Sequence, residues 1–355
     1  MDKNQLKQCI LTLTRNCNLR CEFCSAKKGG YHSNEFMDFG NLKKIIKLCN
    51  DINVKYIVLS GGEPLLYPHF IELLDYIKSM PNKMVPTIAT NGILLEDYNR
   101  CKKIIEHGIK YVDVSLKGKD SKEWLEVAKF DDLTQQMRAI SNLSSLNVEF
   151  TCSMVITLNN VYTFCETLEN ARSVGARNFS FTFVIDNAES SEKDLPYLIS
   201  HDPLLLVDKF ISQIDRINQI TDNEWWIEYS FPLCVYTEKQ LTKLEHRLAE
   251  PCYIRNENIL TLEFDTRLNL LPCSMYIDDK VVGKFGVEFS SASELEAYLK
   301  SETYNHIMKE FSQLPSNYCN SCRHKNFCLG GCPWFWMHCS FETFRDFKIS
   351  KGYDF

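Results

Sequence analysis

The sequence lacks the features of a membrane protein, an exported protein and a nucleic-acid-binding protein. No stretch approaches the roughly 18–20 apolar residues that span a bilayer, and residues 1–5 contain no apolar signal-peptide core. The formal net charge of −6 and the pI of about 5.8 argue against a nucleic-acid footprint. Beyond an alternation of strands and helices there is no internal repeat and no low-complexity segment. We therefore expect a cytoplasmic globular protein that binds neither nucleic acid nor a membrane.

Cysteine, in contrast, is abundant. The chain of 355 residues has 16 cysteines, and without an export signal this number indicates metal binding rather than disulfides. Ten of them fall in spaced motifs: Cys17, Cys21, Cys24, Cys252, Cys273, Cys319, Cys322, Cys328, Cys332 and Cys339. The other six, mostly in apolar runs where a free cysteine packs as a small hydrophobe, are Cys9, Cys49, Cys101, Cys152, Cys165 and Cys234.

The first cysteine motif is a short loop that follows the strand-like run 9–13. Cys17, Cys21 and Cys24 are separated by three and then two residues, so a loop of this length can turn all three sulfurs onto one centre. A zinc site would require a fourth protein ligand and a closed shell. A [4Fe–4S] cluster on three thiolates leaves one iron open to another ligand. At this point a zinc loop and unrelated buried thiols remain alternatives.

With the aromatic Phe23 before its last cysteine, this loop resembles the signature of radical S-adenosylmethionine (radical SAM) enzymes. The resemblance implies that the open iron chelates the amino and carboxylate groups of S-adenosyl-L-methionine. It also implies that an electron from the cluster releases a 5′-deoxyadenosyl radical, which abstracts a hydrogen atom from a substrate. An external reductant such as flavodoxin or ferredoxin would supply that electron.

Strand-like and helix-like runs alternate over the first half of the chain. After the opening strand, helices are predicted at 38–51, 68–79, 96–107, 131–146 and 161–174, and strands at 54–60, 84–89, 111–116, 148–156 and 178–184. Six strands joined by five helices predict an α/β fold with a parallel sheet and right-handed crossovers. Periodicity alone does not separate a partial barrel from a doubly wound sheet. The family resemblance implies the former, a partial (β/α)6 TIM barrel.

The composition changes after Val184. Residues 186–202 are polar and acidic and predict a linker, followed by a helix at 203–220, a strand at 225–229 and a short helix at 239–248. We therefore predict three parts: a radical SAM partial barrel over 1–200, a helical and strand connection over 201–250, and a cysteine-rich domain over 251–355.

Functional residues in parallel sheets gather at the carboxyl ends of the strands. Gly61, Gly62, Glu63 and Pro64 follow the second predicted strand and resemble the family's GGEP motif. The resemblance implies that a backbone carbonyl there accepts a hydrogen bond from the cofactor's amino group, approached closely because glycine has no Cβ. Taken alone, the same residues would predict a simple turn.

The cofactor's other polar groups have less definite partners. Ser115 ends the fourth strand, where the family often uses a hydroxyl against the ribose or carboxylate, although it could equally cap a turn. The arginine that family members often carry shortly afterwards is absent, which leaves Lys117 and Arg138 as candidates for the cofactor's carboxylate.

The second cysteine set is the most specific pattern in the chain. For a single Cys-x2-Cys pair structural zinc would be preferred, but seven thiols are too many for one tetrahedral zinc. The set resembles the SPASM extension of radical SAM enzymes, which carries two auxiliary [4Fe–4S] clusters. The resemblance places Cys319, Cys322, Cys328 and Cys339 on the distal cluster, and Cys252, Cys273 and Cys332 on the cluster nearer the active site.

The nearer cluster departs from the family pattern in two ways. Leu268 stands where the family usually has a glycine, and the gap between the first two cysteines is long, filled by an apparent hairpin of 259–264 and 268–271. With three clear ligands, this cluster leaves an iron open or uses another group. Cys234 and Asp265 are the candidates for a fourth ligand.

Auxiliary clusters offer an electron acceptor whose potential the protein can tune, which favours net oxidation and hence a radical SAM oxidoreductase. The resemblance implies modification of a ribosomally made peptide, by a cross-link or by dehydrogenation. Sulfatase-maturing members usually carry an aspartate where this chain has Ser274, which counts against formylglycine formation. Because we expect no leader-binding domain before the first strand, a peptide would need a separate leader-peptide-binding partner, or direct binding by the acidic linker and 225–226.

Three alternatives remain open. One is a dehydrogenase of a small molecule such as an amino sugar or alcohol. Another is an epimerase in which Cys234 acts catalytically and donates a hydrogen atom to the substrate radical, although a core cysteine is the simpler interpretation. The last is non-catalytic: an iron–sulfur electron carrier or a zinc-bound interaction module.

Overall fold

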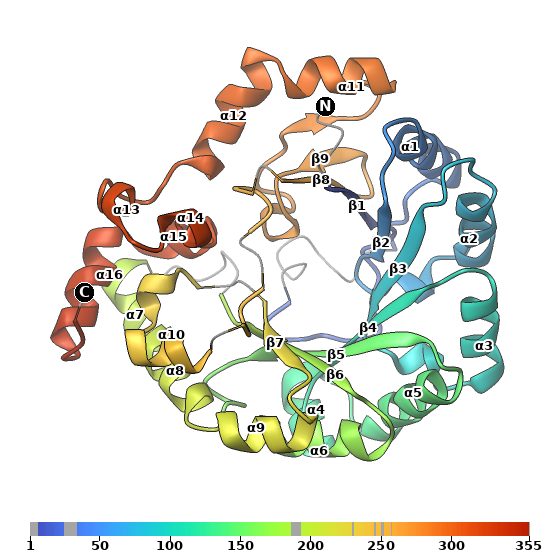
Figure 1. Cartoon of the computed structure of the whole chain (residues 1–355). Coiled ribbons are helices and arrows are strands. Elements are labelled where there is room, and N and C mark those ends of the chain that lie inside the picture. Colours follow the sequence, from blue (N-terminus) through green and yellow to red (C-terminus); the bar gives the residue numbers. More distant parts are fainter. Residues whose placement is uncertain are drawn as a thin grey trace.

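A ring of strands surrounded by helices forms most of the molecule (Figure 1). The computed structural model describes residues 6–24, 34–185, 193–228, 231–244, 246–249, 252–256 and 258–354. Its single sheet has the order β10-β9-β8-β1-β2-β3-β4-β5-β6-β7. The strands are β1 Leu6–Thr12, β2 Tyr56–Ser60, β3 Val85–Thr90, β4 Tyr111–Leu116, β5 Glu149–Ile156, β6 Asn178–Phe183, β7 Trp225–Ile227, β8 Ile259–Phe264, β9 Asn269–Leu271 and β10 Gly283–Lys284.

The predicted parallel sheet and partial barrel are confirmed. Strands β1 to β6 pair in chain order and in parallel, as expected for strands joined by crossover helices. The structure adds one parallel strand at each side, because β7 pairs with β6 and β8 pairs with β1. Strands β8 and β9 form the predicted hairpin. Since Leu6 of β1 lies opposite Ile259 of β8, the predicted cysteine-rich domain shares the sheet of the barrel.

Five helices connect the barrel strands, each close to its predicted position: α1 Phe39–Asp51, α2 Phe70–Lys78, α3 Tyr98–Glu106, α5 Leu133–Ser145 and α6 Phe164–Ser173. Aspartates cap three of them. The carboxylates of Asp38, Asp97 and Asp132 accept hydrogen bonds from first-turn amides of α1, α3 and α5. Each helix buries its apolar stripe against the sheet. In α1 this stripe includes Leu42, Ile45 and Ile46.

Two local predictions were wrong. The predicted linker at 186–202 includes helix α7 Asp194–His201, while its residues 186–192 lie outside the described part of the chain. The single helix predicted at 203–220 is two helices, α8 Pro203–Ile211 and α9 Ile214–Thr221. The sequence analysis also missed α4 Ser121–Ala128, a short helix between β4 and α5.

The carboxyl-terminal elements line the side where the ring does not close. Figure 1 shows α12 to α16 between β7 and β9, on the side where the described strands leave the sheet open. The remaining helices are α10 Glu238–Lys243, α11 Ala292–Leu299, α12 Glu302–Ser312, α13 Tyr318–Ser321, α14 Lys325–Cys328, α15 Phe335–His338 and α16 Phe341–Ser350. In the part of the chain that the structure describes, no helix combines the length and apolarity that a membrane crossing requires.

Candidate active site

A cavity of about 980 Å³ lies inside the barrel and extends to the carboxyl ends of its strands. Alternate residues of single strands line it, such as Asp113 and Ser115 of β4 and Ser153 and Val155 of β5, because side chains of a strand alternate between two faces. Two sets of thiols border this same space: Cys17, Cys21, Cys24, Cys252, Cys273 and Cys332. The structure therefore brings together around one cavity the two cysteine triads that the sequence analysis assigned to two clusters.

The turn after β2 holds the first cysteine loop by its backbone. The amide of Gly62 donates to the carbonyl of Thr14 at 2.8 Å, and the amide of Glu63 donates to the carbonyl of Asn16 at 2.8 Å. A Cβ on Gly61 would lie 2.5 Å from the Thr14 oxygen, and one on Gly62 would lie 2.3 Å from the Asn16 oxygen. Both glycines are therefore needed to let the cysteine loop approach, whatever their contact with a cofactor.

Glu63 joins this turn to the next one and does not line the cavity. Its buried carboxylate accepts from the amide of Leu65 at 3.1 Å, the hydroxyl of Thr90 at 2.8 Å and the amide of Asn91 at 2.9 Å. Burial raises the pKa of Glu63 above its usual value, while these donors oppose the shift. These hydrogen bonds give Glu63 a positioning role between the two turns, and its predicted cofactor contact stays a prediction.

Asn91 continues the connection to the cysteine loop. Its side-chain amide donates to Oδ1 of Asn18 at 2.8 Å and lies 4.0 Å from Sγ of Cys17. The buried Gln136 of α5 donates to the carbonyls of Asn91 and Ser115, at 2.7 and 3.0 Å. Thus the loops after β1, β2, β3 and β4 form one hydrogen-bonded frame.

The missed helix α4 supports the other side of the cysteine loop. The amide of Arg20 donates to the carbonyl of Ala128 at 2.8 Å, and that of Glu22 donates to the carbonyl of Val127 at 3.0 Å. The fully buried Trp124 packs in one cluster with Cys21 and its neighbours. A signal for α4 was present in the sequence, since Asp120 caps the helix and its carboxylate accepts from the amide of Glu123.

Lys117 provides a buried positive charge beside the first cysteine loop. Its ammonium donates to the hydroxyl of Ser115 at 2.6 Å and lies 5.2 Å from the ring centroid of Phe23. Both Lys117 and Ser115 line the cavity. The other candidate, Arg138, is on the outer surface of α5, where it forms an ion pair with Glu96 at 2.6 Å. Of the two basic residues, only Lys117 is in a position to meet a ligand's carboxylate.

Two carboxylates on the cavity wall were not singled out from the sequence. Asp113 of β4 lines the cavity, and its buried Oδ1 has no hydrogen-bond partner. Burial, with the negative charge of Glu228 as a further cause, raises the pKa of Asp113 to about 7. Glu228 follows β7, lines the same cavity and accepts from the hydroxyl of Thr182 at 3.2 Å. Burial raises the pKa of Glu228 as well, so a cationic group between these two acids would favour their ionised forms.

The nearer-cluster triad, Cys252, Cys273 and Cys332, also faces the cavity, but neither predicted fourth ligand joins it. Asp265 is committed to the β8–β9 turn, where its carboxylate accepts from the amides of Arg267 and Asn269 and from the side chain of Asn269. Leu268 in this turn has φ of +66°, a left-handed conformation that favours glycine.

Cys234 lines a second, smaller pocket and does not line the barrel cavity. This pocket, of about 250 Å³, also contains Cys319, Cys322 and Cys328. The predicted hydrogen-atom donation by Cys234 therefore has no support from its position. Cys339 is buried in the core and does not line either of the two cavities.

Trp225, predicted as part of a peptide-binding region, is a core residue. It is buried, packs edge-on against Phe181 with centroids 5.8 Å apart, and donates from its indole to Asn218 at 2.8 Å. Its buried position removes it from a surface that could bind a peptide.

The donor sets fit iron–sulfur clusters. In the described residues, no three His, Cys, Asp or Glu side chains are grouped so as to hold a single metal ion. The thiols line the walls of the two cavities. Three thiolates beside an open volume provide the ligands of a cluster with one iron left for another molecule.

Comparisons with known proteins agree with this chemistry. The model of the radical SAM superfamily matches residues 11–187. GTP 3′,8-cyclase from Clostridium perfringens (strain SM101 / Type A) is 30% identical over 148 residues, which are 41% of this chain and 45% of that protein. The matched segment thus spans about half the length of the curated relative.

Two solved structures cover most of the chain. The structure described as native anSMEcpe with bound AdoMet and Cp18Cys peptide has a TM-score of 0.70 at 17% identity, covering 98% of this chain and 97% of that one. Streptococcus suis SuiB bound to precursor peptide SuiA has a TM-score of 0.66 at 16% identity, covering 93% and 72%. At these identities the likeness shows the fold.

Proposed function

From the premise that this chain is a radical SAM enzyme, with its radical SAM domain over residues 11–187, we propose that it oxidises a ribosomally made peptide. We also propose that residues 251–355 are a SPASM domain with two auxiliary [4Fe–4S] clusters. The single observation that carries the proposal is that two cysteine triads border one cavity. One triad would hold the cluster that binds S-adenosyl-L-methionine, and the other an electron acceptor within the same space.

The chain's residues divide the work between them. Cys17, Cys21 and Cys24 would hold the first cluster, which when bound would supply the electron for reductive cleavage of S-adenosyl-L-methionine. Lys117 would bind the carboxylate of the cofactor, because it is the one cation among the described residues that line the cavity and already donates to Ser115. The backbone of 61–62 fixes the loop in place.

The carboxylates of Asp113 and Glu228 on the cavity wall orient the substrate. Asp113 has an oxygen without a partner, so an ammonium or guanidinium group of a peptide would satisfy it and keep it ionised. A cavity of about 980 Å³ has room for the cofactor and a substrate side chain, since single-ligand pockets measure about 300–1,000 Å³. Two similar structures are described with bound peptides, which supports the same substrate class.

GTP is the substrate suggested by the names of the curated relatives, but the charges of the cavity disfavour it. Among the lining residues that the structure describes, Lys117 alone carries a positive charge, whereas Asp113 and Glu228 are acids. A triphosphate would require more cations than this wall presents. The same acids do favour a second candidate, a small amine such as an amino sugar, which would be dehydrogenated in place of a peptide.

The test begins with cofactor cleavage. Anaerobically reduced protein is incubated with S-adenosyl-L-methionine, and 5′-deoxyadenosine is measured by chromatography. Wild type should form it, Cys21→Ala should not, and Cys322→Ala should retain cleavage while losing oxidised product. Retention of cleavage by Cys21→Ala would overturn the assignment of the first cluster.

Substrate class is tested by adding candidates to the same reaction. Peptides encoded beside the gene, small amines and GTP are supplied separately, and products are analysed by mass spectrometry. We expect a peptide that has lost two hydrogens, together with stoichiometric 5′-deoxyadenosine. A GTP-derived product and no change in any peptide or amine would contradict the proposal.

A further inference from the structure

The pocket between the 3₁₀ turn Leu233–Val235 and the carboxyl-terminal loops contains four cysteines. Cys319 and Cys322 come from α13 and its end, Cys328 ends α14, and Cys234 comes from a segment about 90 residues earlier. The amide of Leu233 donates to Sγ of Cys328 at 3.4 Å, so the backbone beside Cys234 already contacts a sulfur of the set. Four thiols around a volume of about 250 Å³ match the ligand number of a [4Fe–4S] cluster.

Close backbone packing fixes Cys234 at this position. Gly331 has φ of +71°, and a Cβ there would lie 2.5 Å from Cα of Pro232. The loop that contains Cys328 and Cys332 can therefore approach the 3₁₀ turn only because this residue is glycine. Arg255 also stabilises this loop, because its guanidinium donates to the carbonyls of Leu329 and Gly331 at 3.2 and 2.9 Å.

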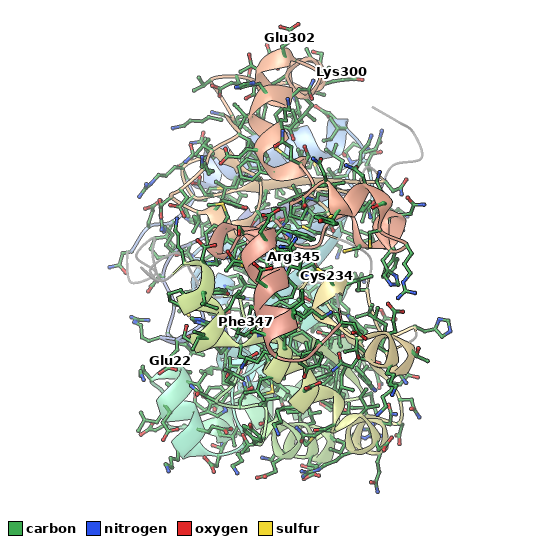
Figure 2. The ribbon with its side chains drawn as sticks, turned by 90° about the vertical axis from the view of Figure 1, so that its left-hand side faces the viewer. Glu22, Cys234, Lys300, Glu302, Arg345 and Phe347 are labelled. Carbon is green, nitrogen blue, oxygen red and sulfur yellow. The ribbon has the colours of Figure 1, made fainter. Side chains whose placement is uncertain are left out.

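A buried lysine supports the other side of the turn. Lys348 of α16 donates to the carbonyl of Cys234 at 2.8 Å and to that of Tyr236 at 3.3 Å. Figure 2 shows Cys234 next to α16, the helix that carries Arg345 and Phe347. A cation here offsets the negative charge that a cluster on four thiolates would bring into a largely apolar pocket.

Cys339 has different surroundings. It ends α15 and precedes the cap of α16, where the amide of Ser340 donates to Asp194 at 2.9 Å. It is not among the residues that line the four-cysteine pocket. His324 does line that pocket, but its Nε2 lies 3.2 Å from Oε1 of Glu238 and is engaged there.

We propose that Cys234, and not Cys339, is the fourth thiolate ligand of the distal cluster, with Cys319, Cys322 and Cys328 as the other three. This inference rests on the proposed SPASM clusters but is independent of the substrate. It replaces the ligand that the family resemblance implies with one from the connection before the cysteine-rich domain. The distal cluster would then join two parts of the chain that the sequence separates.

The experiment measures iron without relying on activity. In a Cys17→Ala, Cys21→Ala, Cys24→Ala background, which lacks the first cluster, Cys234→Ala and Cys339→Ala are introduced separately. We expect the background protein to hold about eight irons in two clusters. Cys234→Ala should lose up to about four of these irons or convert one cluster to a three-iron form, detected by EPR spectroscopy. Cys339→Ala, the matched control, should keep its iron and its EPR spectrum.

Serine variants guard against a simple failure to fold. A serine at position 234 retains an oxygen ligand, so Cys234→Ser should keep iron but change the EPR signal of one cluster, whereas Cys339→Ser should leave the signals unaltered. Iron loss in Cys339→Ala with full retention in Cys234→Ala would overturn the proposal, as would iron loss in His324→Ala alone. Wild-type protein with about four irons, or with zinc in their place, would instead refute the auxiliary clusters themselves.

Discussion

The barrel cavity and the carboxyl-terminal pocket both gather cysteines, but they are built for different purposes. The barrel cavity measures about 980 Å³, carries charged and polar side chains and is bordered by thiols in sets of three. The carboxyl-terminal pocket measures about 250 Å³, is lined by aromatic and apolar groups such as Trp336 and Phe341, and contains four thiols. The three-thiol sets thus line the larger cavity, and the four-thiol set lines the smaller pocket.

This difference suggests how ligand number divides the tasks of the chain. A cluster on three thiolates can bind a substrate or cofactor, whereas a cluster on four can only pass electrons. Glycine contacts fix both sites, since Gly62 meets the cysteine loop and Gly331 meets Pro232. Mutations that act on one site should therefore leave the other intact.

The largest effects should come from these two glycines. In Gly62→Ala the new Cβ would overlap the Asn16 carbonyl, so the first cysteine loop must move and 5′-deoxyadenosine formation should fall by at least about tenfold. In Gly331→Ala the clash with Pro232 should remove iron from the distal site and leave cofactor cleavage intact. Iron analysis and 5′-deoxyadenosine assays of both variants compare the sites directly. Equal loss of both properties in both variants would mean that the two sites are not independent.

Lys117 should affect the barrel cavity alone. Lys117→Ala removes the buried cation, and a lost charge-assisted hydrogen bond of about 1.5–3 kcal/mol should raise the KM for S-adenosyl-L-methionine by about 10–100-fold. Arg138→Ala is the matched control, because Arg138 pairs with Glu96 on the outer surface. Steady-state kinetics and iron content decide the outcome. An unchanged KM in Lys117→Ala would remove this residue from the cofactor site.

Glu63 should act through stability rather than through direct contact. Glu63→Gln keeps the shape but weakens a buried acceptor of three hydrogen bonds, and we expect a loss of about 1–3 kcal/mol in unfolding free energy. Chemical denaturation of the protein with its clusters intact measures this loss. A strongly raised KM at unchanged stability would instead indicate a direct contact with the cofactor.

A pH dependence of stability should arise at Asp113. Because its folded pKa is raised to about 7, the folded state holds a proton that the unfolded chain releases above its usual pKa of about 3.9. Stability should therefore fall as pH rises from about 4 to about 7, by at most about 1.4 kcal/mol per pH unit. Asp113→Asn removes this slope. In thermal unfolding, the stability of this variant relative to wild type should therefore be higher at about pH 7 than at about pH 5. A parallel pH profile of the two proteins would contradict the assigned shift.

The parallel sheet was predictable because its evidence is local and repeated. Apolar strands alternate with amphipathic helices along the chain, and their order in the sheet follows their order in the sequence. The grouping of Cys17, Cys21 and Cys24 was also predictable, because motif spacing places them in one short loop after the first strand. The addition of β7 and β8 at the edges was not, since pairing between distant segments leaves no local pattern.

The details of the sites depended on contacts between distant residues. Cys234 lies in an apolar run that is indistinguishable in sequence from a core strand. Its place in the distal pocket depends on the contact between Pro232 and Gly331 and on the hydrogen bond from Lys348. Glu63 matched a motif, yet the structure shows its carboxylate bound to Thr90 and Asn91. Asp113 belongs to no motif, and its raised pKa follows from its burial, which the sequence does not show.

The proposed function requires that the barrel hold a cluster on three thiolates whose remaining iron binds S-adenosyl-L-methionine. EPR spectroscopy of the anaerobically reduced protein, with and without this cofactor, tests it most directly. We predict that the cofactor shifts the signal of one cluster, that Cys21→Ala lacks this signal, and that Cys322→Ala retains it with the same shift. A wild-type spectrum that is identical with and without S-adenosyl-L-methionine would contradict the account.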